Sequence, residues 1–149
     1  MPDPLGVDPR VSVAALGVSS VSADQMALRS MFEGLQWQWD IVPSLEKARQ
    51  RMHHGATPGV VVCQHLLPDG DWKLLFQEVL ALPRPPRFVV LSRLADEDLW
   101  MDVLNCGGYD LLSIPFYLPE VSRVLQSAAK SWHVPGVARR TRHAGGGAS

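Results

Sequence analysis

The sequence has few of the features that mark membrane, secreted or strongly charged proteins. Its 149 residues include 2 cysteines, and no apolar run approaches the roughly 18 residues that a membrane-spanning helix needs. The formal net charge is −1, which gives no overall attraction to nucleic acid or to an anionic membrane. Residues 1–10 lack the basic start and apolar stretch of a signal peptide. We therefore expect a cytoplasmic protein.

Two further features limit the kinds of chemistry that we expect of this chain. Cys63 and Cys106 fall inside apolar segments, so we expect buried, inert thiols and no disulfide. The loop after the first apolar run has no glycine-rich phosphate-binding fingerprint, which argues against a flavodoxin-like enzyme or ligand binder. The remaining composition, with 46% hydrophobic and 19% charged residues, is that of an ordinary globular protein, and the length suits one domain.

The two ends of the chain differ in composition from its middle. Residues 1–10 are rich in Pro, Gly and Asp, and we expect a disordered lead. Residues 133–149 read as a flexible, Gly-rich tail whose basic side chains include Arg139, Arg140 and Arg142. Residues 11–132 hold the regular hydrophobic patterns and form the folded, mildly acidic domain.

Strand-like and helix-like segments alternate five times along this domain. The strand patterns occupy residues 11–18, 37–41, 60–63, 88–91 and 109–113. Helical spacing of apolar residues follows each of them, over residues 22–35, 45–52, 72–80, 96–104 and 119–128. A repeated βα unit with short connections indicates one parallel sheet with helices on both faces.

Local signals indicate where the helices begin and end. Ser22 and Gln25 have the spacing of a capping box, and Ser44 is a suitable N-cap for the second helix. Pro119 suits the first turn of the last helix, and Gly107 suits the end of the helix before it.

The stretch over residues 60–72, VVVCQHLLPDGDW, contains the candidate site. Its β-branched start predicts a strand buried on both faces, and ligands bind just beyond the carboxyl ends of such strands. Gln64 and His65 occupy that position, and neither is an acid. His65 has no partner at ligand spacing, so we expect an ordinary hydrogen bond. Asp69 and Asp71 flank a glycine, where Asp is typical of turns.

Three motifs resemble the receiver domains of bacterial two-component response regulators. They are LLPDGDW after the third strand, SRLADE after the fourth and SIPF after the fifth. The resemblance covers residues 11–132. One segment, LSRLADEDLWMDVLNCGGYDLLSIPF, also resembles a subgroup of stand-alone, receiver-like proteins. The resemblance implies a flavodoxin-like (βα)5 three-layer sandwich with strand order 2-1-3-4-5, a phosphorelay signalling role, and a cis peptide bond between Ile114 and Pro115.

The resemblance also implies where the site residues of an active receiver would fall. Such a site has an acid pair that holds Mg²⁺, an Asp that accepts the phosphoryl group, a hydroxyl and a Lys. Taken position by position, these fall on Ser19 and Ser20, Gln64, Ser92 and Ile114, and the aromatic switch position falls on Leu111. Only the hydroxyl is kept, so the sequence predicts a degenerate pseudo-receiver with no metal, no cofactor and no enzymatic activity.

Our leading interpretation is a signalling module that acts by protein–protein contact without phosphoryl transfer. The resemblance implies a contact face made by the fourth helix, fifth strand and fifth helix, for another signalling protein or a second copy. The candidate contact residues, expected to be exposed, are Asp98, Asp102, Asp110 and Arg123. Arg93 beside the pocket is a possible contact for a phosphate or sulfate, because Arg supplies a fork of donors.

An alternative interpretation is a transcriptional or nucleic-acid regulator. The tail arginines would then contact phosphates, and binding would fall steeply with salt. The tryptophans also suggest a stacking platform for single strands. Trp72 and Trp100 fall on apolar helical stripes, so we expect both in the core, while Trp37, Trp39 and Trp132 are open to either role.

Overall fold

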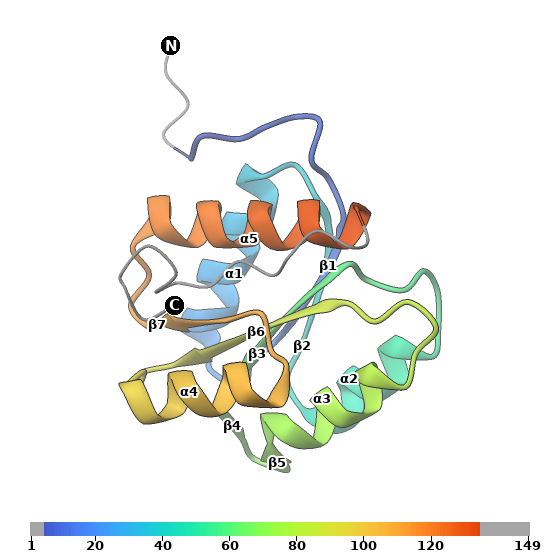
Figure 1. The fold of residues 1–149 in the computed structure, drawn as a ribbon, viewed down its shortest axis with the longest axis vertical. Helices are drawn as coiled ribbons and strands as arrows, with labels where there is room; N and C mark the ends of the chain where they lie inside the picture. Colours follow the sequence, from blue (N-terminus) through green and yellow to red (C-terminus); the bar gives the residue numbers. More distant parts are fainter. Residues whose placement is uncertain (1–4, 135–149) are drawn as a thin grey trace.

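The computed structural model describes residues 5–134, which form a five-stranded sheet between two layers of helices (Figure 1). The sheet strands are β1 (Ala14–Val18), β2 (Gln38–Val42), β3 (Val60–Gln64), β6 (Arg87–Ser92) and β7 (Asp110–Ser113). All neighbours pair in parallel in the order β2-β1-β3-β6-β7. This is the 2-1-3-4-5 order, so the predicted flavodoxin-like sandwich is confirmed.

A small antiparallel hairpin leaves the end of β3. It consists of β4 (Leu66–Leu67) and β5 (Gly70–Asp71) and leads directly into α3. The five helices are α1 (Ser22–Gly34), α2 (Leu45–Met52), α3 (Trp72–Leu80), α4 (Glu97–Cys106) and α5 (Leu118–His133). Figure 1 shows α1 and α5 over one face of the sheet and α2, α3 and α4 over the other. None of these helices combines the length and the apolar character needed to cross a membrane.

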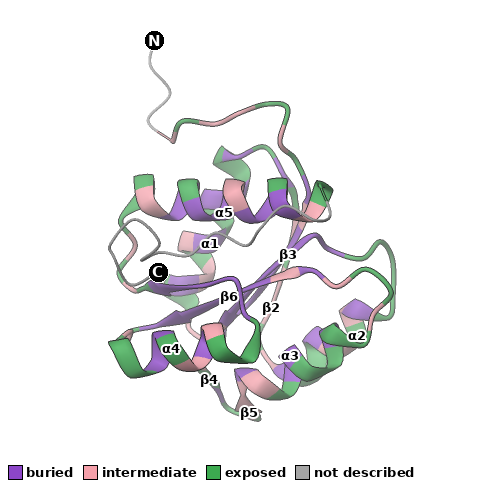
Figure 2. Cartoon of the chain, in the orientation of Figure 1, coloured by how far each residue is buried: buried purple, intermediate pink, exposed green. Residues whose placement is uncertain are grey.

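The central strands divide their side chains between two hydrophobic cores. Val60 and Val62 of β3 face α1 and α5, whereas Val61 and Cys63 face the other layer of helices. This two-residue alternation is the pleat of a strand that is covered on both faces, and Figure 2 shows β3 and β6 largely buried. Each fully buried valine contributes about 1.5–3 kcal/mol, which explains why a short β-branched run is enough to place this strand in the middle of the sheet.

The tryptophans serve packing in this fold. Trp72 is buried between Phe76 and Phe88, with ring centroids 5.8 and 6.0 Å away, and Trp100 is buried on α4 as predicted. Trp37 is also buried. The other two rings are partly exposed, and an arginine of this chain lies over each, Arg29 over Trp39 and Arg84 over Trp132.

The predicted cap of α2 is confirmed and that of α1 is wrong. Ser44 Oγ accepts from the backbone N–H of Lys47 at 3.1 Å. At α1 the N-cap is Val21, no side chain caps the helix, and the side chain of Gln25 donates instead to the carbonyl of Ser19 at 2.6 Å. The helix begins one residue earlier than a capping box at Ser22 requires, so Gln25 reaches back to the end of β1.

Residues 5–10, which we expected to belong to a disordered lead, lie against α5 in the structure. Ser122 Oγ donates to the carbonyl of Leu5, and the side chain of Gln126 bonds the backbone of both Gly6 (3.0 Å) and Asp8 (2.8 Å). Leu5 and Val7 pack against the core between α1 and α5. This segment forms no helix or strand, and the polar side chains of α5 supply hydrogen-bond partners for its backbone. Residues 1–4 and 135–149, including the predicted basic tail, lie outside the described residues.

The two cysteines have different environments. Cys63 is buried in β3, and its burial raises the pKa of the thiol strongly, so the group stays protonated and inert as predicted. Cys106 is exposed, which makes the expectation of a second buried thiol wrong. It lies on the last turn of α4, beyond the buried stripe formed by Leu99, Trp100 and Val103.

Candidate functional site

The predicted site residues meet at the carboxyl edge of the sheet. Gln64 ends β3, Ser92 ends β6, and Ile114 follows β7; with Leu66 and Leu94 they line a shallow hollow of about 160 Å³. Ser19 and Ser20 follow β1 and reach Gln64 by hydrogen bonds. The parallel order of the strands brings these positions together although they are spread over most of the domain.

Gln64 is held at both ends of its amide. Its Oε1 accepts from Ser19 Oγ at 3.0 Å and from the backbone N–H of Ser20 at 2.9 Å. Its Nε2 donates to the carbonyl of Leu66 at 2.7 Å. The side chain therefore bridges the loop after β1 and the β4–β5 hairpin without carrying charge.

The two serines at the acid-pair positions are also committed. Ser19 is fully buried, and its Oγ accepts from the backbone N–H of Val21 at 3.2 Å. Ser20 is exposed, and its hydroxyl lies 3.4 Å from Gln64 Oε1. Mg²⁺ prefers carboxylate oxygens, and two hydroxyls with an amide do not supply that charge. Within residues 5–134 no cluster of three or more His, Cys, Asp or Glu has metal-binding geometry. These donors do not fit Mg²⁺.

The remaining positions of the site are neutral. Ser92 is buried, its Oγ accepts from the backbone N–H of Leu94 at 2.9 Å, and His65 Nδ1 lies 3.4 Å from the same oxygen. Ile114 packs against the core with its aliphatic side chain, and the peptide bond to Pro115 is cis as the resemblance implies. Leu111, at the switch position, is buried in the core below α4. Ser92, Ile114 and Leu111 supply no cation for a phosphate.

Arg93 is paired with a residue that the sequence did not single out. Its two terminal nitrogens donate to both carboxylate oxygens of Asp24 at 2.8 and 2.9 Å. Asp24 lies in the first turn of α1 and is 4% exposed. The fork of donors expected to hold a phosphate or sulfate is therefore filled by the carboxylate of this chain. A sequence signal existed, because Asp24 falls four residues before Leu28 on the buried stripe of α1.

The two aspartates near the pocket mouth cap helices. Asp69 accepts from the backbone N–H groups of Leu45 and Glu46 at the start of α2, both at 3.0 Å. These bonds, first the one from Leu45, hold the pKa of Asp69 below its usual value. Asp71 is the N-cap of α3 and accepts from the backbone N–H of Lys73 at 2.9 Å. Both therefore have a structural role, as caps of α2 and α3, in place of the local turn role expected from the sequence.

The predicted contact residues do not share one surface. Asp110 is 1% exposed, so its prediction as an exposed contact is wrong; β7 turns this side chain inward, and its Oδ1 accepts from the backbone N–H of Leu111. Asp102 pairs with Lys73 of α3 at 2.8 Å. Asp98, exposed and one helical turn earlier, shares that flank of α4. The sequence did not reveal which flank of α4 faces α3.

Arg123 is the candidate contact that lies towards β7. It is exposed on α5, on the same stripe as Ser127 and Ser131. Ser127 bonds the hydroxyl of Tyr109 just before β7, and Ser131 accepts from Arg87 of β6 at 2.9 Å. The flank of α5 that carries Arg123 therefore faces the β7 edge of the sheet.

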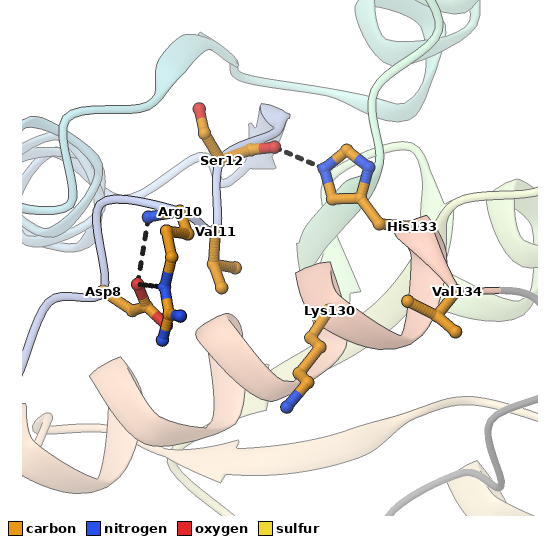
Figure 3. A pocket seen from close by; sticks show the side chains of 7 residues that line it. All are labelled: Asp8, Arg10, Val11, Ser12, Lys130, His133 and Val134. Atoms are coloured by element: carbon orange, nitrogen blue, oxygen red, sulfur yellow. Dashed lines mark hydrogen bonds and ion pairs between the residues drawn. The ribbon is translucent and has the colours of Figure 1, made fainter.

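A wider hollow, of about 460 Å³, lies away from this site (Figure 3). It opens between residues 8–12 and the last turn of α5, and its lining residues are Asp8, Arg10, Val11, Ser12, Lys130, His133 and Val134. Asp8 and Arg10 form an ion pair at 3.1 Å, and His133 Nε2 bonds the carbonyl of Ser12. Asp8 and Arg10 thus compensate each other, while Lys130 adds a further positive charge to the lining. The hollow results from the docking of the N-terminal segment on α5.

The solved structures similar to this chain include receiver domains and a two-component response regulator. One is the signal receiver domain of an HD domain-containing protein from Pseudomonas fluorescens Pf-5, with a TM-score of 0.72 and 21% identity over 80% of this chain and 96% of that one. Another is a two-component response regulator from Clostridium difficile, with a TM-score of 0.72 and 16% identity over 81% and 98%. A third is the beryllofluoride-activated NtrC4 receiver domain dimer, with a TM-score of 0.73 and 18% identity over 80% and 98%.

At these identities the likeness shows that the chain has the receiver fold. No family model and no curated protein matches the sequence. The fold is therefore shown by structure, and the function has to be argued from the site.

Proposed function

We propose that this chain is a receiver-like module of two-component, phosphorelay signalling that acts by protein–protein contact and carries out no phosphoryl transfer. The observation that carries the proposal is Gln64 at the phosphoacceptor position, with both ends of its amide hydrogen-bonded inside the protein. A carboxylate oxygen is a nucleophile for phosphorus, whereas a neutral amide is not activated in this way. The receiver fold supplies the signalling context.

The electrostatics of the pocket support the same conclusion. Catalysis of phosphoryl transfer consists largely of neutralising negative charge with metal ions and cationic side chains. Ser19 and Ser20 offer hydroxyls in place of carboxylates, Ile114 offers an aliphatic chain in place of an ammonium, and Arg93 is neutralised by Asp24. The positions that correspond to the metal-holding acid pair and to the lysine of an active receiver therefore carry no charge.

The switch position supports a scaffold that does not report phosphorylation. Leu111 is an aliphatic residue buried among the side chains beneath α4. An aromatic ring at this position could move between a buried and an exposed rotamer, but burying leucine leaves no favourable exposed alternative. We infer that the module presents one constant surface, and that its input is the presence or absence of its partner.

We place the main contact face on α4, β7 and α5, for a signalling protein or a second copy of the chain. β7 is an edge strand of the described sheet, Met101 of α4 is 45% exposed, and Arg123 lies on the β7 flank of α5. Residues 5–10 cover the other flank of α5. The NtrC4 receiver is described as a dimer, so this fold can support self-association.

The test is incubation of the purified chain with Mg²⁺ and a small phosphodonor such as acetyl phosphate, followed by intact-mass measurement. We expect the unmodified mass. The matched control is Gln64→Ala, which removes the amide and should behave identically. A stable phosphoryl adduct on the natural chain that disappears in Gln64→Ala would refute the proposal.

A further inference from the structure

Two leucines that line the hollow beside Gln64 are exposed and pack against neither hydrophobic core. Leu94 follows β6 and is 73% exposed, and Leu66 begins the β4–β5 hairpin and is 58% exposed. Neither belongs to the two hydrophobic cores or to the side chains packed against them. Both line the hollow of about 160 Å³, together with Ile114. Exposed apolar groups gathered around a hollow are typical of a contact surface.

The floor of this hollow can be covered at little cost. Gln64 uses both ends of its amide within the protein, and Ser92 Oγ accepts from the backbone N–H of Leu94. A polar group that already has its partners loses little when water is removed, whereas an unpaired one costs about 1–3 kcal/mol. Because these polar groups are hydrogen-bonded within the protein and carry no charge, the carboxyl edge of the sheet can be covered by a partner that excludes water from it.

The charges beside the hollow determine which partner fits. The Arg93–Asp24 pair on its rim is electrically balanced. Three residues after Leu94, α4 begins with Glu97 and Asp98, which are exposed and form no ion pair within residues 5–134. The uncompensated charge next to the apolar rim is therefore negative, and a complementary partner carries Lys or Arg beside its apolar side chain.

We propose that the carboxyl edge around Gln64 is a docking surface, termed the edge site, formed by Leu66, Leu94, Ile114 and the start of α4. Its occupant is a segment of another protein that inserts one large apolar side chain between the leucines and places basic residues against Glu97 and Asp98. A second copy of this chain fits less well, because a two-fold contact would bring the same acids of both copies together. The edge site is additional to the α4–β7–α5 face and does not depend on it.

Site-specific photo-crosslinking in the full chain, expressed in its own cells, tests this proposal. A benzophenone amino acid is placed at position 94 or 66 in the edge site, at 101 on the α4–β7–α5 face, and at 80 as a control. Leu80, at the end of α3, is also an exposed leucine. The cross-linked segment of the partner is then sequenced by mass spectrometry.

We expect positions 94 and 66 to label one and the same segment, in which a large apolar residue lies within a few positions of Lys or Arg, and position 80 to leave it unlabelled. Combining Glu97→Lys with Asp98→Lys should lower the yield at position 94 by about tenfold, which corresponds to about 1.4 kcal/mol. A synthetic peptide of the labelled segment should bind the purified chain and lose affinity for Leu94→Ser but not for Leu80→Ser.

Four outcomes overturn the edge site. They are labelling of a second copy of the chain, labelling of an acidic or wholly polar segment, a yield unaffected by the charge reversal, and no adduct at 94 and 66. Adducts at position 101 alone would reject the edge site and leave the proposed α4–β7–α5 face standing. Adducts at positions 94 and 66 without one at position 101 would support the edge site and reject the proposed α4–β7–α5 face.

Discussion

Two neighbouring parts of one strand show how this molecule divides its tasks. Val60, Val61, Val62 and Cys63 are buried in the two cores, and they are the kind of residues that any central strand of a parallel sheet requires. Gln64, the next residue, lies at the carboxyl edge of the sheet, where ligands bind in open α/β folds, and its side chain has no acidic group. The interior thus determines the fold, and a few side chains at the edge determine what the fold can do.

The largest effect on stability is expected in the interior. Trp72→Ala removes a fully buried ring from the cluster with Phe76 and Phe88, and such truncations cost about 3–5 kcal/mol. Urea denaturation followed by circular dichroism should show a correspondingly lower midpoint. A loss below about 1 kcal/mol would mean that the helical layer on this face does not hold the sheet as described.

A smaller effect is expected at the edge. Gln64→Ala leaves the buried hydroxyl of Ser19 and the carbonyl of Leu66 without their partner, and we expect a loss of about 1–3 kcal/mol. The same denaturation series measures it, with Gln64→Glu as a control of equal length that introduces charge. If Gln64→Ala were neutral, the amide bridge would not be a structural element of the site.

The comparison also shows what could be predicted from the sequence. The β-branched run of β3 and the apolar stripes of the helices are local patterns, so the sandwich and its strand order followed from them and from the family resemblance. The site positions lie at the ends of these strands, so their place in the fold could be predicted together with the strands. Gln64 does contact Ser19 and Ser20, as that placement requires.

Interactions between distant segments could not be predicted. The pair of Asp24 and Arg93 joins residues 69 positions apart, and the docking of Leu5 on Ser122 joins residues 117 apart. Periodicity gives the phase of a helix relative to the core but not which neighbour flanks it, so the pairing of Asp102 with Lys73 of α3 could not be predicted. The burial of Asp110 at the start of an edge strand has no local signal either.

The cap formed by Asp69 should make stability depend on pH. Backbone N–H donors from α2 lower the pKa of this carboxyl in the folded chain. Its contribution is therefore complete above the unfolded value of about 4 and is lost as the pH falls through the lower folded value. We expect Asp69→Ala to cost about 0.5–2 kcal/mol at neutral pH, in the range for helix caps, and progressively less towards pH 3. Denaturation midpoints of both proteins across this range measure it, and a pH-independent difference would contradict it.

The smallest effect on stability is expected at Leu94. Its side chain is exposed and packs against neither core, so Leu94→Ser should change the free energy of unfolding by less than about 0.5 kcal/mol. Thermal melting of the two proteins side by side is sufficient to check this. A clear destabilisation would show that this leucine supports the fold and would weaken its assignment to the edge site.

The central claim is that the receiver fold is intact while its site lacks the groups for phosphoryl transfer. Intact mass after incubation with Mg²⁺ and acetyl phosphate tests this directly on two proteins, the natural chain and a variant that combines Ser19→Asp, Ser20→Asp, Gln64→Asp and Ile114→Lys. We expect no phosphoryl adduct on the natural chain and an adduct on the variant, because only the site has been changed. A phosphoryl adduct at the edge of β3 in the natural chain would contradict it.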